Sequence, residues 1–527
     1  MTGAKIQSLI AMVLYMASVI GIGIYFSKRA NKNSDNYFLG GRSLGPWVAA
    51  MSAEASDMSS YLLMGLPGLA YWCGIADAAW TAIGLALGTY LNWLLVAKRL
   101  RRYSIKVNAI TIPDYFSKRF HEIEGRKILM TVASLIILIF FSVYTGSCFV
   151  ACGKLFSTLF GLPYIPMMII GAIFVIIYTF LGGFLAESAS DFMQGVVMIL
   201  SLGIVLTAGT VAAGGLAAVL ENVGQFPGFL EFFGIASPVT DASGVQQVKD
   251  GLALFGEAGD YTMLTVVSTM SWGLGYFGMP QVLLRFMAIR KTEELKFSRR
   301  IATVWCVVSL FAAVSIGVIG RAFLPTQAEL LTASGAENVF IIICEKLMPP
   351  LLAGIVMSGI LAATISSSDS YLLIAASAFS KNLYQGIFKR NATDKQVMTC
   401  SRIVLLIIAA FGMLVALDEN SVIFKVVSFA WAGFGAAFGP LMLFSLFWKR
   451  VTQKGAIAGM IAGGAMVFIW EYIFTPLGNS LGISWLTIYE LLPAFLVSAL
   501  VIVVVSLLDR APSQEIQQEF DTVNEIA

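Results

Sequence analysis

Two carboxylates stand inside an apolar stretch of the chain and are the first residues that could do chemistry. Glu54 and Asp57 lie in residues 51–61, which read MSAEASDMSSY. An ionised carboxylate at the centre of a bilayer costs about 2.5–3.5 kcal/mol on insertion scales, so such residues usually face a partner or a cavity. The small residues around them allow a helix to be interrupted. The stretch predicts a polar binding site; the structural alternative is a polar patch that joins helices.

A second polar cluster occupies residues 362–370, AATISSSDS, in another apolar run. A lone pair of serines would indicate little, because hydroxyls in a helix bond back to their own carbonyls. Here four serines, one threonine and Asp369 gather in nine residues. Hydroxyls and the carbonyls of an interrupted helix suit a hard cation such as Na⁺. The cluster predicts a cation site, which the intramembrane carboxylate of Asp191 could extend or tune.

A third stretch, residues 269–280, reads TMSWGLGYFGMP. Its glycines and Pro280 weaken a helix, whereas Trp272 and Tyr276, four residues apart, share one helical face and offer aromatic walls. The structural alternative is an ordinary flexible span with packed rings. Residues 273–278 also match the dinucleotide pattern G-x-G-x-x-G, but the strand and βαβ unit that this pattern needs are missing, so we reject nucleotide binding.

The sequence does not predict an enzyme. The only histidine, His121, lies in the basic stretch 118–122, where we expect a solvated side chain. A single histidine argues against a histidine-based metal site and against a Ser/His/Asp triad. We therefore expect neither catalysis nor a cofactor.

Membrane-spanning helices are predicted to position these residues. The 527 residues are 58% hydrophobic and 12% charged, whereas a soluble protein carries about 25% charged residues. The apolar runs are about twenty residues long, which is enough for a helix to cross a hydrocarbon core of about 30 Å. The alternation of apolar and polar residues that is typical of a membrane barrel is absent. We expect an all-α polytopic membrane protein. The thirteen predicted spans are 6–27, 46–72, 74–97, 128–156, 163–182, 190–214, 262–282, 301–322, 350–380, 399–417, 421–447, 455–477 and 485–508.

The basic residues test this count. With residue 1 outside, 28 of the 34 Lys and Arg residues, Arg285 among them, fall on the cytoplasmic side, as the positive-inside rule requires. A missed or extra helix would invert the later loops. We predict an outer N-terminus and a cytoplasmic C-terminus, one transmembrane domain over 1–514 and an acidic, solvated cytoplasmic tail over 515–527. The outer segments at about 215–261 and 323–349 are long, and the first could hold a short surface helix.

The two spans with interruptions, 46–72 and 262–282, lie five spans apart, and this odd offset reverses their orientation. Broken helices at corresponding positions of inverted halves indicate the central site of a secondary transporter. A channel would need a continuous polar pore, and a membrane sensor would need an output domain, which we do not find after residue 508. The pattern favours a transporter.

Longer motifs resemble one known family. They are RSLGP at 42–46, SDMS at 56–59, LLMGLPG at 62–68, WGLGYFG at 272–278, RFMA at 285–288 and AWAGFGAAFGP at 430–440. From about residue 6 to 513 the chain closely resembles bacterial sodium/proline symporters, a group within the sodium:solute symporter family. The resemblance implies alternating access and a LeuT-type core of two inverted five-helix repeats at about 46–214 and 262–447. Spans 6–27, 455–477 and 485–508 would be peripheral.

The resemblance also implies residue roles. The implied sodium site consists of the carbonyls of Ala55 and Met58 together with Ala363, Ser366 and Ser367. Asp57 matches an aspartate linked to sodium dependence. The implied substrate contacts are Ser59, Tyr144, Trp272, Tyr276 and Pro280, with Ser60 and Tyr61 where close relatives commonly carry Gly-Trp.

The chain departs from the family pattern at Glu54 and Asp369, where small or neutral residues are expected. Unpaired and ionised, the two would cost about 5–7 kcal/mol on insertion, so we expect pairing, protonation or contact with water. We predict Na⁺-driven import of L-proline across the bacterial cytoplasmic membrane, with no nucleic acid and no obligate protein partner. Na⁺- or H⁺-coupled symport of another amino acid or a carboxylate is the alternative.

Overall fold

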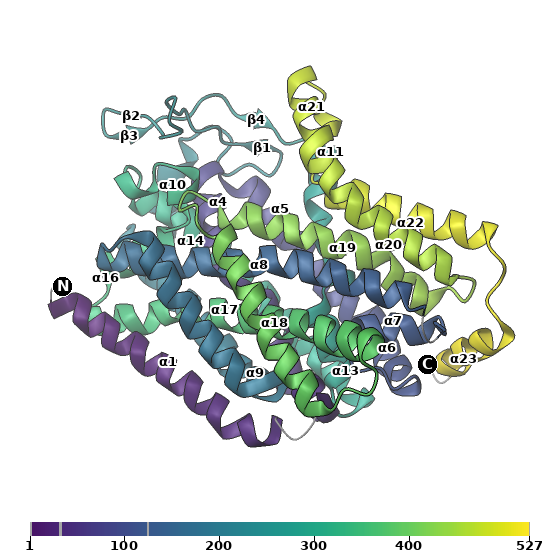
Figure 1. Ribbon diagram of the computed structural model, residues 1–527. Coiled ribbons are helices and arrows are strands. Elements are labelled where there is room, and N and C mark those ends of the chain that lie inside the picture. Colours follow the sequence, from purple (N-terminus) through teal and green to yellow (C-terminus); the bar gives the residue numbers. More distant parts are fainter. Residues whose placement is uncertain (1–2, 31–33, 124–125, 526–527) are drawn as a thin grey trace.

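Long helices make up most of the computed structural model, which describes residues 3–30, 34–123 and 126–525 (Figure 1). Within these residues, ten helices are long and apolar enough to cross a membrane. They are Gly3–Phe26, Ile75–Lys106, Ile128–Phe160, Gly183–Ala212, Thr292–Phe323, Pro350–Phe388, Asp394–Val415, Ile423–Phe447, Gln453–Leu481 and Leu491–Leu508. The predicted all-α membrane fold is confirmed.

The remaining three predicted spans correspond to a shorter helix and two broken ones. The shorter helix is Tyr164–Phe180. The first broken span consists of α3 (Pro46–Asp57), a π-helical turn at Tyr61–Gly65 and α4 (Leu66–Cys73). The second consists of α11 (Met263–Met270), α12 (Trp272–Gly275), a 3₁₀ turn at Tyr276–Gly278 and α13 (Pro280–Ala288). The interruptions predicted from sequence are therefore present in both spans.

One kink joins two spans that the sequence separated. The predicted spans 163–182 and 190–214 are the two helices of α9 (Tyr164–Ala212), which meet without a loop at a kink where Gly183 has the non-helical angles φ 59° and ψ −177°. Glycine adopts this conformation without a Cβ clash, and a Cβ here would lie 2.8 Å from the Tyr37 ring. The helix C-terminal to the kink includes residues 183–189, which we had predicted as a connection.

The other elements follow in chain order. They are α1 (Gly3–Ala30), α2 (Ser34–Leu39), α5 (Ile75–Leu91), α6 (Ala97–Lys106), α7 (Ile112–Arg119), α8 (Ile128–Phe160), α10 (Leu216–Gly224), β1 (Gly234–Ile235), β2 (Val248–Lys249), β3 (Leu252–Ala253), β4 (Gly259–Asp260), α14 (Leu295–Phe323), α15 (Ala333–Ala336), α16 (Val339–Leu347), α17 (Pro350–Ser377), α18 (Asp394–Val415), α19 (Ile423–Phe447), α20 (Gln453–Ile469), α21 (Thr475–Leu481), α22 (Leu491–Leu508) and α23 (Gln514–Glu525).

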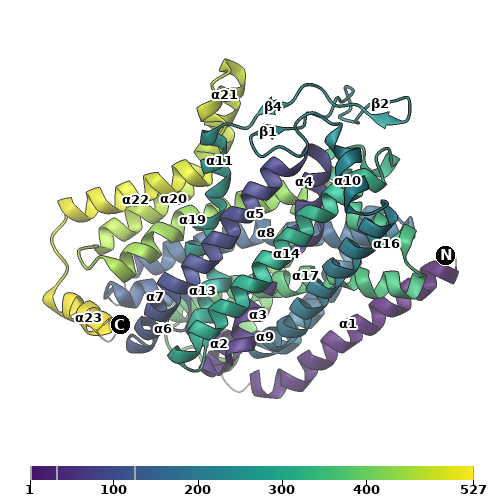
Figure 2. The same ribbon diagram turned by 180° about the vertical axis from the view of Figure 1, so that it is seen from behind.

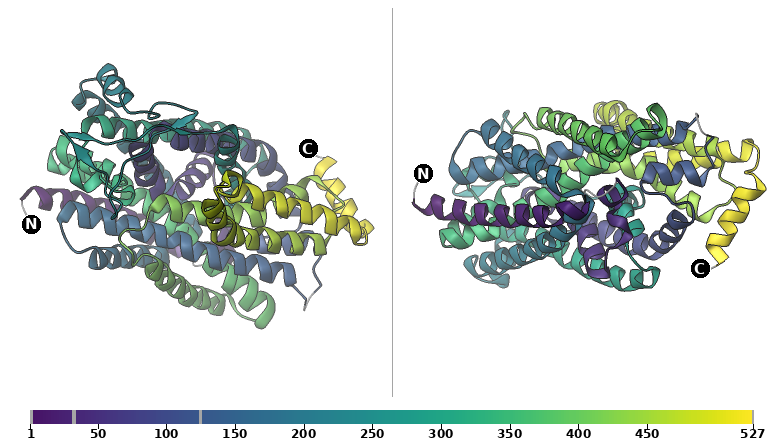
Figure 3. Two further views of the ribbon diagram at one scale, coloured as in Figure 1. Left: turned by 90° about the horizontal axis from the view of Figure 1, so that it is seen from above. Right: turned by 60° about the horizontal axis from the view of Figure 1, so that its bottom comes forward.

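Helix α17 lies in the interior of the bundle, where it packs against α1, α8 and α9. On the other side, α20 and α22 pack on each other and on α19. Helix α1 and the pair α20 and α22 thus form opposite edges of the bundle (Figures 1 and 2). The two ends of the chain also lie on opposite sides when the molecule is seen from above (Figure 3). The polar residues of α17 are buried as a result.

The first of the two long segments that we predict to lie outside contains more structure than the sequence predicted. It holds the short helix α10, as expected, and two small antiparallel sheets, β1 with β4 and β2 with β3. These strands lie at the top of the molecule in Figure 1, beside α10.

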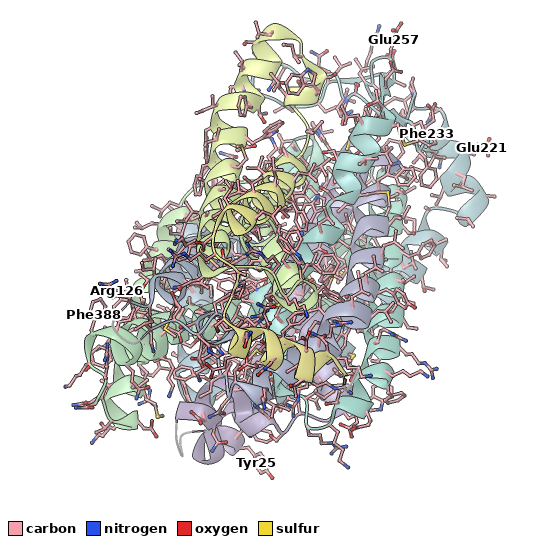
Figure 4. The ribbon with its side chains drawn as sticks, turned by 90° about the vertical axis from the view of Figure 1, so that its right-hand side faces the viewer. Tyr25, Arg126, Glu221, Phe233, Glu257 and Phe388 are labelled. Atoms are coloured by element: carbon pink, nitrogen blue, oxygen red, sulfur yellow. The ribbon has the colours of Figure 1, made fainter. Side chains whose placement is uncertain are left out.

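The prediction of a solvated tail is wrong for α23. Its Phe520 and Val523 are buried, and Glu519 accepts a hydrogen bond from Tyr103 Oη at 2.8 Å. His121, which we expected to be solvated, lies 3.3 Å from Glu519 and is half-buried. In Figure 4, α23 is the short helix of the deepest yellow, and it lies across the lower part of the bundle. Helix α23 packs on the bundle through its apolar residues Phe520 and Val523, although its sequence is otherwise acidic. Residues 526 and 527, the end of the predicted tail, lie outside the described residues.

Candidate functional site

The serine cluster of α17 contacts the backbone of the first broken span. Ser366 Oγ donates a hydrogen bond to the carbonyl oxygen of Ala55 at 2.8 Å and lies 3.2 Å from the carbonyl of Ala363. Ser367 Oγ lies 3.5 Å from the same Ala55 carbonyl. Met58 ends α3 with φ −71° and ψ 3°. The structure thus brings four of the five predicted sodium residues together, with the fifth at the adjacent break.

The cluster formed by Ala55, Ala363, Ser366 and Ser367 offers neutral oxygen atoms that are buried from solvent. Ala55, Ala363, Ser366 and Ser367 are fully buried. Carbonyl and hydroxyl oxygens are ligands that a hard monovalent cation accepts. Because the carbonyl of Ala55 belongs to α3 and the hydroxyls belong to α17, a cation bound here would join two segments that are about 310 residues apart in sequence.

Asp57 is fully buried beside this group. One carboxylate oxygen accepts a hydrogen bond from Gln281 Nε2 on α13 at 3.2 Å. The other oxygen has no hydrogen-bond partner among the described residues. Nearby, Tyr61 Oη donates a hydrogen bond to Met58 Sδ at 3.3 Å, and the buried rings of Tyr144 and Tyr371 pack on each other with centroids 4.3 Å apart.

The predicted aromatic wall is present around Trp272. Its ring stacks on Tyr61 with centroids 6.2 Å apart, and it also packs against Phe424, Trp431 and Tyr489. The indole nitrogen of Trp431 donates to the carbonyl of Trp272 at 2.8 Å. The second broken span is thereby fixed to α19.

Glycines make this close contact between the broken span and α19 feasible. A Cβ on Gly275 would overlap the indole of Trp431, and a Cβ on Gly278 would overlap the backbone of Phe434. The two glycine-rich motifs at 272–278 and 430–440 therefore pack directly on each other, which gives a physical reason for both.

The other predicted substrate residues lie in the same buried region. The carbonyl of Tyr276 accepts from Asn92 Nδ2 at 2.9 Å, Ser59 Oγ accepts from the Tyr61 amide at 3.4 Å, and Pro280 begins α13. The hydroxyls of Ser60, Tyr144 and Tyr276 are buried without a hydrogen-bond partner in the described structure. A buried polar group without a partner is costly, so these hydroxyls indicate where a polar ligand can bind.

Asp191 belongs to a different cluster from the serine hydroxyls. It accepts from Ser52 Oγ at 2.6 Å and lies 3.2 Å from Arg285 Nη2. The same guanidinium nitrogen pairs with Glu187, which also accepts from Ser370 Oγ. The structure supports ion pairing of Asp191; within the described residues, the hydrogen bonds of Ser366 and Ser367 go to backbone carbonyls and not to Asp191.

Two features of this cluster were missed from the sequence. Arg285 is fully buried, so counting it as a residue of the cytoplasmic loop is wrong. The reason is that α13 continues to Ala288, beyond the predicted end at 282. Glu187 fell in the predicted connection at 183–189. An intramembrane carboxylate four residues before Asp191, on the same helical face, was the available signal.

The two unexpected acids are each hydrogen-bonded through one oxygen. Glu54 accepts from Thr89 Oγ1 at 3.0 Å and from Trp93 Nε1 at 3.4 Å. Asp369 accepts from the amide of Ser370 at 2.7 Å. The second oxygen of each acid has no partner within the described residues. Asp369 and Glu187 also line a cavity of about 10 Å³, which is room for about one water molecule.

On the predicted outer side, a buried ion pair fixes the start of α19. Lys154 Nζ lies 2.7 Å from Glu337 Oε2. Glu337 also accepts the backbone N–H groups of Ile423 at 2.9 Å and Phe424 at 3.0 Å. A carboxylate at a helix N-terminus is favourable because the first amides have no partner in the helix. Since the Phe424 ring lies 5.2 Å from Trp272, this ion pair positions one wall of the aromatic cluster.

Comparison with known proteins agrees with this arrangement. The model of the sodium:solute symporter family matches residues 37–463. The sodium/proline symporter of Haemophilus influenzae is 42% identical, covering 98% of this chain and 97% of its own length. The osmoregulated proline transporter of Bacillus subtilis is 38% identical and covers 99% of both chains.

Two solved structures share the fold. A Na⁺-coupled sialic acid symporter in a substrate-bound, outward-open state has a TM-score of 0.75 at 20% identity, covering 96% of this chain and 99% of its own. A nucleobase-cation-symport-1 family transporter in a closed conformation has a TM-score of 0.53 at 13% identity, covering 93% and 99%. These likenesses confirm the predicted LeuT-type fold.

Proposed function

This chain belongs to the sodium:solute symporter family, and we propose that it imports L-proline by symport with Na⁺. The observation that carries the proposal is the contact of Ser366 with the Ala55 carbonyl, which puts a cation-type oxygen cluster beside the buried tyrosines and Asp57. Its relatives at 37–42% identity are sodium/proline symporters and a proline transporter. The inward sodium gradient supplies the energy for uptake.

The proposed sodium site uses backbone and hydroxyl oxygens from two segments. Ala55 and Met58 contribute carbonyls, and Ala363, Ser366 and Ser367 contribute the oxygens of α17. The hydrogen bond from Ser366 to Ala55 would be replaced by a shared cation, because both oxygens can then direct lone pairs toward it. Asp57 supplies nearby negative charge that favours the cation. Sodium thus stabilises the arrangement in which α3 and α17 lie together.

The proposed substrate site lies between Tyr61, Trp272 and the unpartnered hydroxyls. The apolar ring of proline fits the aromatic faces of Tyr61 and Trp272, which exclude water from the site. The hydroxyls of Ser60, Tyr144 and Tyr276 provide hydrogen bonds to the charged end of the amino acid. Pro280, which has no amide hydrogen, ends the extended backbone at Met279 and so fixes the break behind Tyr276.

Alternating access follows from this arrangement. The two broken spans carry one side of the site, and α8 and α17 carry the other. Sodium and proline bound between them favour closure of the site. After Na⁺ and proline are released to the cytoplasm, the empty protein returns to the outward-facing state. The proposed setting is the bacterial cytoplasmic membrane, with the N-terminus outside and the C-terminus in the cytoplasm.

A second candidate is symport of another amino acid or of a carboxylate, coupled to Na⁺ or H⁺. It is favoured by Tyr61, which replaces the tryptophan of close relatives, and by the buried acids Glu54, Glu187 and Asp369. Such acids can carry a coupled proton. The two candidates differ in the ion that drives uptake and in the solute that binds.

Uptake by proteoliposomes tests the proposal. Purified protein is reconstituted, and radiolabelled L-proline is added with an inward Na⁺ gradient or with choline in its place. We expect concentrative uptake only with the Na⁺ gradient. Uptake with choline and an inward pH gradient would favour proton coupling. Binding of a different amino acid, but not of proline, in a Na⁺-containing thermal-shift panel would decide against proline as the substrate.

A further inference from the structure

Tyr371 is a buried side chain beside the proposed substrate site that none of the roles above uses. It is fully buried on α17. Its hydroxyl has no hydrogen-bond partner within the residues that the structure describes. Its ring stacks on Phe141 with centroids 4.9 Å apart and a 17° interplanar angle, and it packs on Tyr144 at 4.3 Å. Tyr371 is therefore held rigidly while its polar end remains unsatisfied.

The position of Tyr371 connects the two proposed sites. Tyr371 follows Ser367 by four residues on α17, so the two side chains lie on the same face one turn apart. Tyr144 comes from α8, in the first half of the chain. The contact between Tyr144 and Tyr371 therefore joins the two halves next to the sodium residues. A ligand held by both tyrosines would be coupled mechanically to α17.

The unpartnered atoms match the two charges of a zwitterionic amino acid. Tyr144 and Tyr371 each offer an O–H donor, which a carboxylate accepts with strong, charge-assisted hydrogen bonds. Asp57 is fully buried at the end of α3, two residues after Ala55, and has an oxygen without a partner in the described part of the chain. That oxygen is an acceptor for an ammonium group. The negative end of the substrate is thus directed to the tyrosines and its positive end to Asp57.

We propose that the hydroxyls of Tyr144 and Tyr371 bind the carboxylate of the transported amino acid, which makes Tyr371 a further substrate-binding residue. The inference rests on the proposed function, because it concerns the orientation of the substrate within the same site. It also gives the hydroxyl of Tyr371, one turn after Ser367, a role that an aromatic ring alone would not fill.

Equilibrium binding to the purified protein in Na⁺ tests this inference with two ligands. Proline carries the carboxylate, and prolinamide replaces it with a neutral amide. We expect Tyr371→Phe to raise the Kd of proline by about tenfold to hundredfold, the usual range for a lost hydrogen bond to a charged group. The Ki of prolinamide should change less than about threefold, because phenol–amide bonds are weaker than phenol–carboxylate bonds. Sodium-induced thermal stabilisation without substrate should be unchanged.

Tyr164→Phe is the matched control. The Tyr164 hydroxyl is bonded to the carbonyl of Ala416, away from the site, so the variant should bind both ligands as the unaltered protein does. A proline Kd within twofold of the unaltered value in Tyr371→Phe would overturn the inference. Equal losses for proline and prolinamide would also overturn it, since they would show a role in shape alone.

The unaltered protein gives a test that needs no variant. It should bind proline at least about tenfold more tightly than prolinamide; equal affinities would refute a carboxylate site even if Tyr371→Phe did not fold. If the unaltered protein binds no proline but binds another amino acid, the proposed function fails instead. The same comparison is then made with that amino acid and its amide.

Discussion

Ser366 Oγ donates to the carbonyl oxygen of Ala55 at 2.8 Å, across a junction between α17 and α3. This hydrogen bond holds the broken span on the intact helix and places two oxygens where a cation can bind both. Ser367 adds a hydroxyl 3.5 Å from the same carbonyl. The affinity of the protein for Na⁺ should therefore depend on both hydroxyls.

Ser366→Ala and Ser367→Ala each remove one oxygen ligand. We expect the Na⁺ concentration for half-maximal proline uptake to rise about tenfold, which corresponds to about 1.4 kcal/mol, while the KM of proline at saturating Na⁺ changes little. Ser377→Ala is the control, because the Ser377 hydroxyl bonds only to its own helix at Ile374. The proposed site would be refuted by Na⁺ dependence that remains unchanged in both serine variants.

Arg285 should be required for stability because it is the buried cation that Glu187 and Asp191 share. Removing one member of a buried ion pair costs about 3–5 kcal/mol, since the remaining charges lose their partner. We expect Arg285→Ala to lower the thermal midpoint strongly, and Glu187→Gln combined with it to restore part of the loss. Arg290→Ala breaks an exposed pair with Glu294 and should have little effect. An unchanged midpoint in Arg285→Ala contradicts the expectation.

Most of the helical spans could be predicted because a long apolar helix is the element that crosses a bilayer, and the distribution of Lys and Arg supported the count. The serines of the proposed sodium site could be singled out because so many hydroxyl groups rarely occur together in an apolar run, and the family resemblance supplied Ala55 and Ala363. Glu187 was missed because the second helix of α9 begins directly at the Gly183 kink, where the sequence indicated a connection. Tyr371 was missed because a buried tyrosine in an apolar run has the same sequence pattern as a packed aromatic residue.

Glu54 provides a test of proton coupling. Its Oε1 accepts from Thr89 and Trp93, and the amide oxygen of glutamine can accept both bonds. Glu54→Gln therefore removes the ionisable carboxyl group with little change in packing. With Na⁺ as the only coupling ion, uptake should stay within about twofold and keep its pH profile, since an isosteric neutral group preserves these contacts. A loss of pH dependence together with a loss of uptake would instead indicate that Glu54 carries a proton. Thr89→Val, which removes only a donor, controls for the hydrogen bond.

Replacing the single buried residue Phe520 should release the C-terminal helix α23 from the bundle. Phe520 is buried, and the guanidinium of Arg119 lies 5.2 Å from its ring centroid. Replacing a buried phenylalanine with alanine costs about 3–5 kcal/mol in a protein core, and a twelve-residue helix has little stability of its own without packing. We expect Phe520→Ala to expose the tail, so that a glutamate-specific protease cleaves at Glu515 and Glu519 faster than in the unaltered protein. Gln518→Ala, at an exposed position of α23, should leave the cleavage rate as it is. Equal cleavage in Phe520→Ala and the unaltered protein would mean that the polar contacts of Glu519 with Tyr103 and His121 suffice to hold the helix.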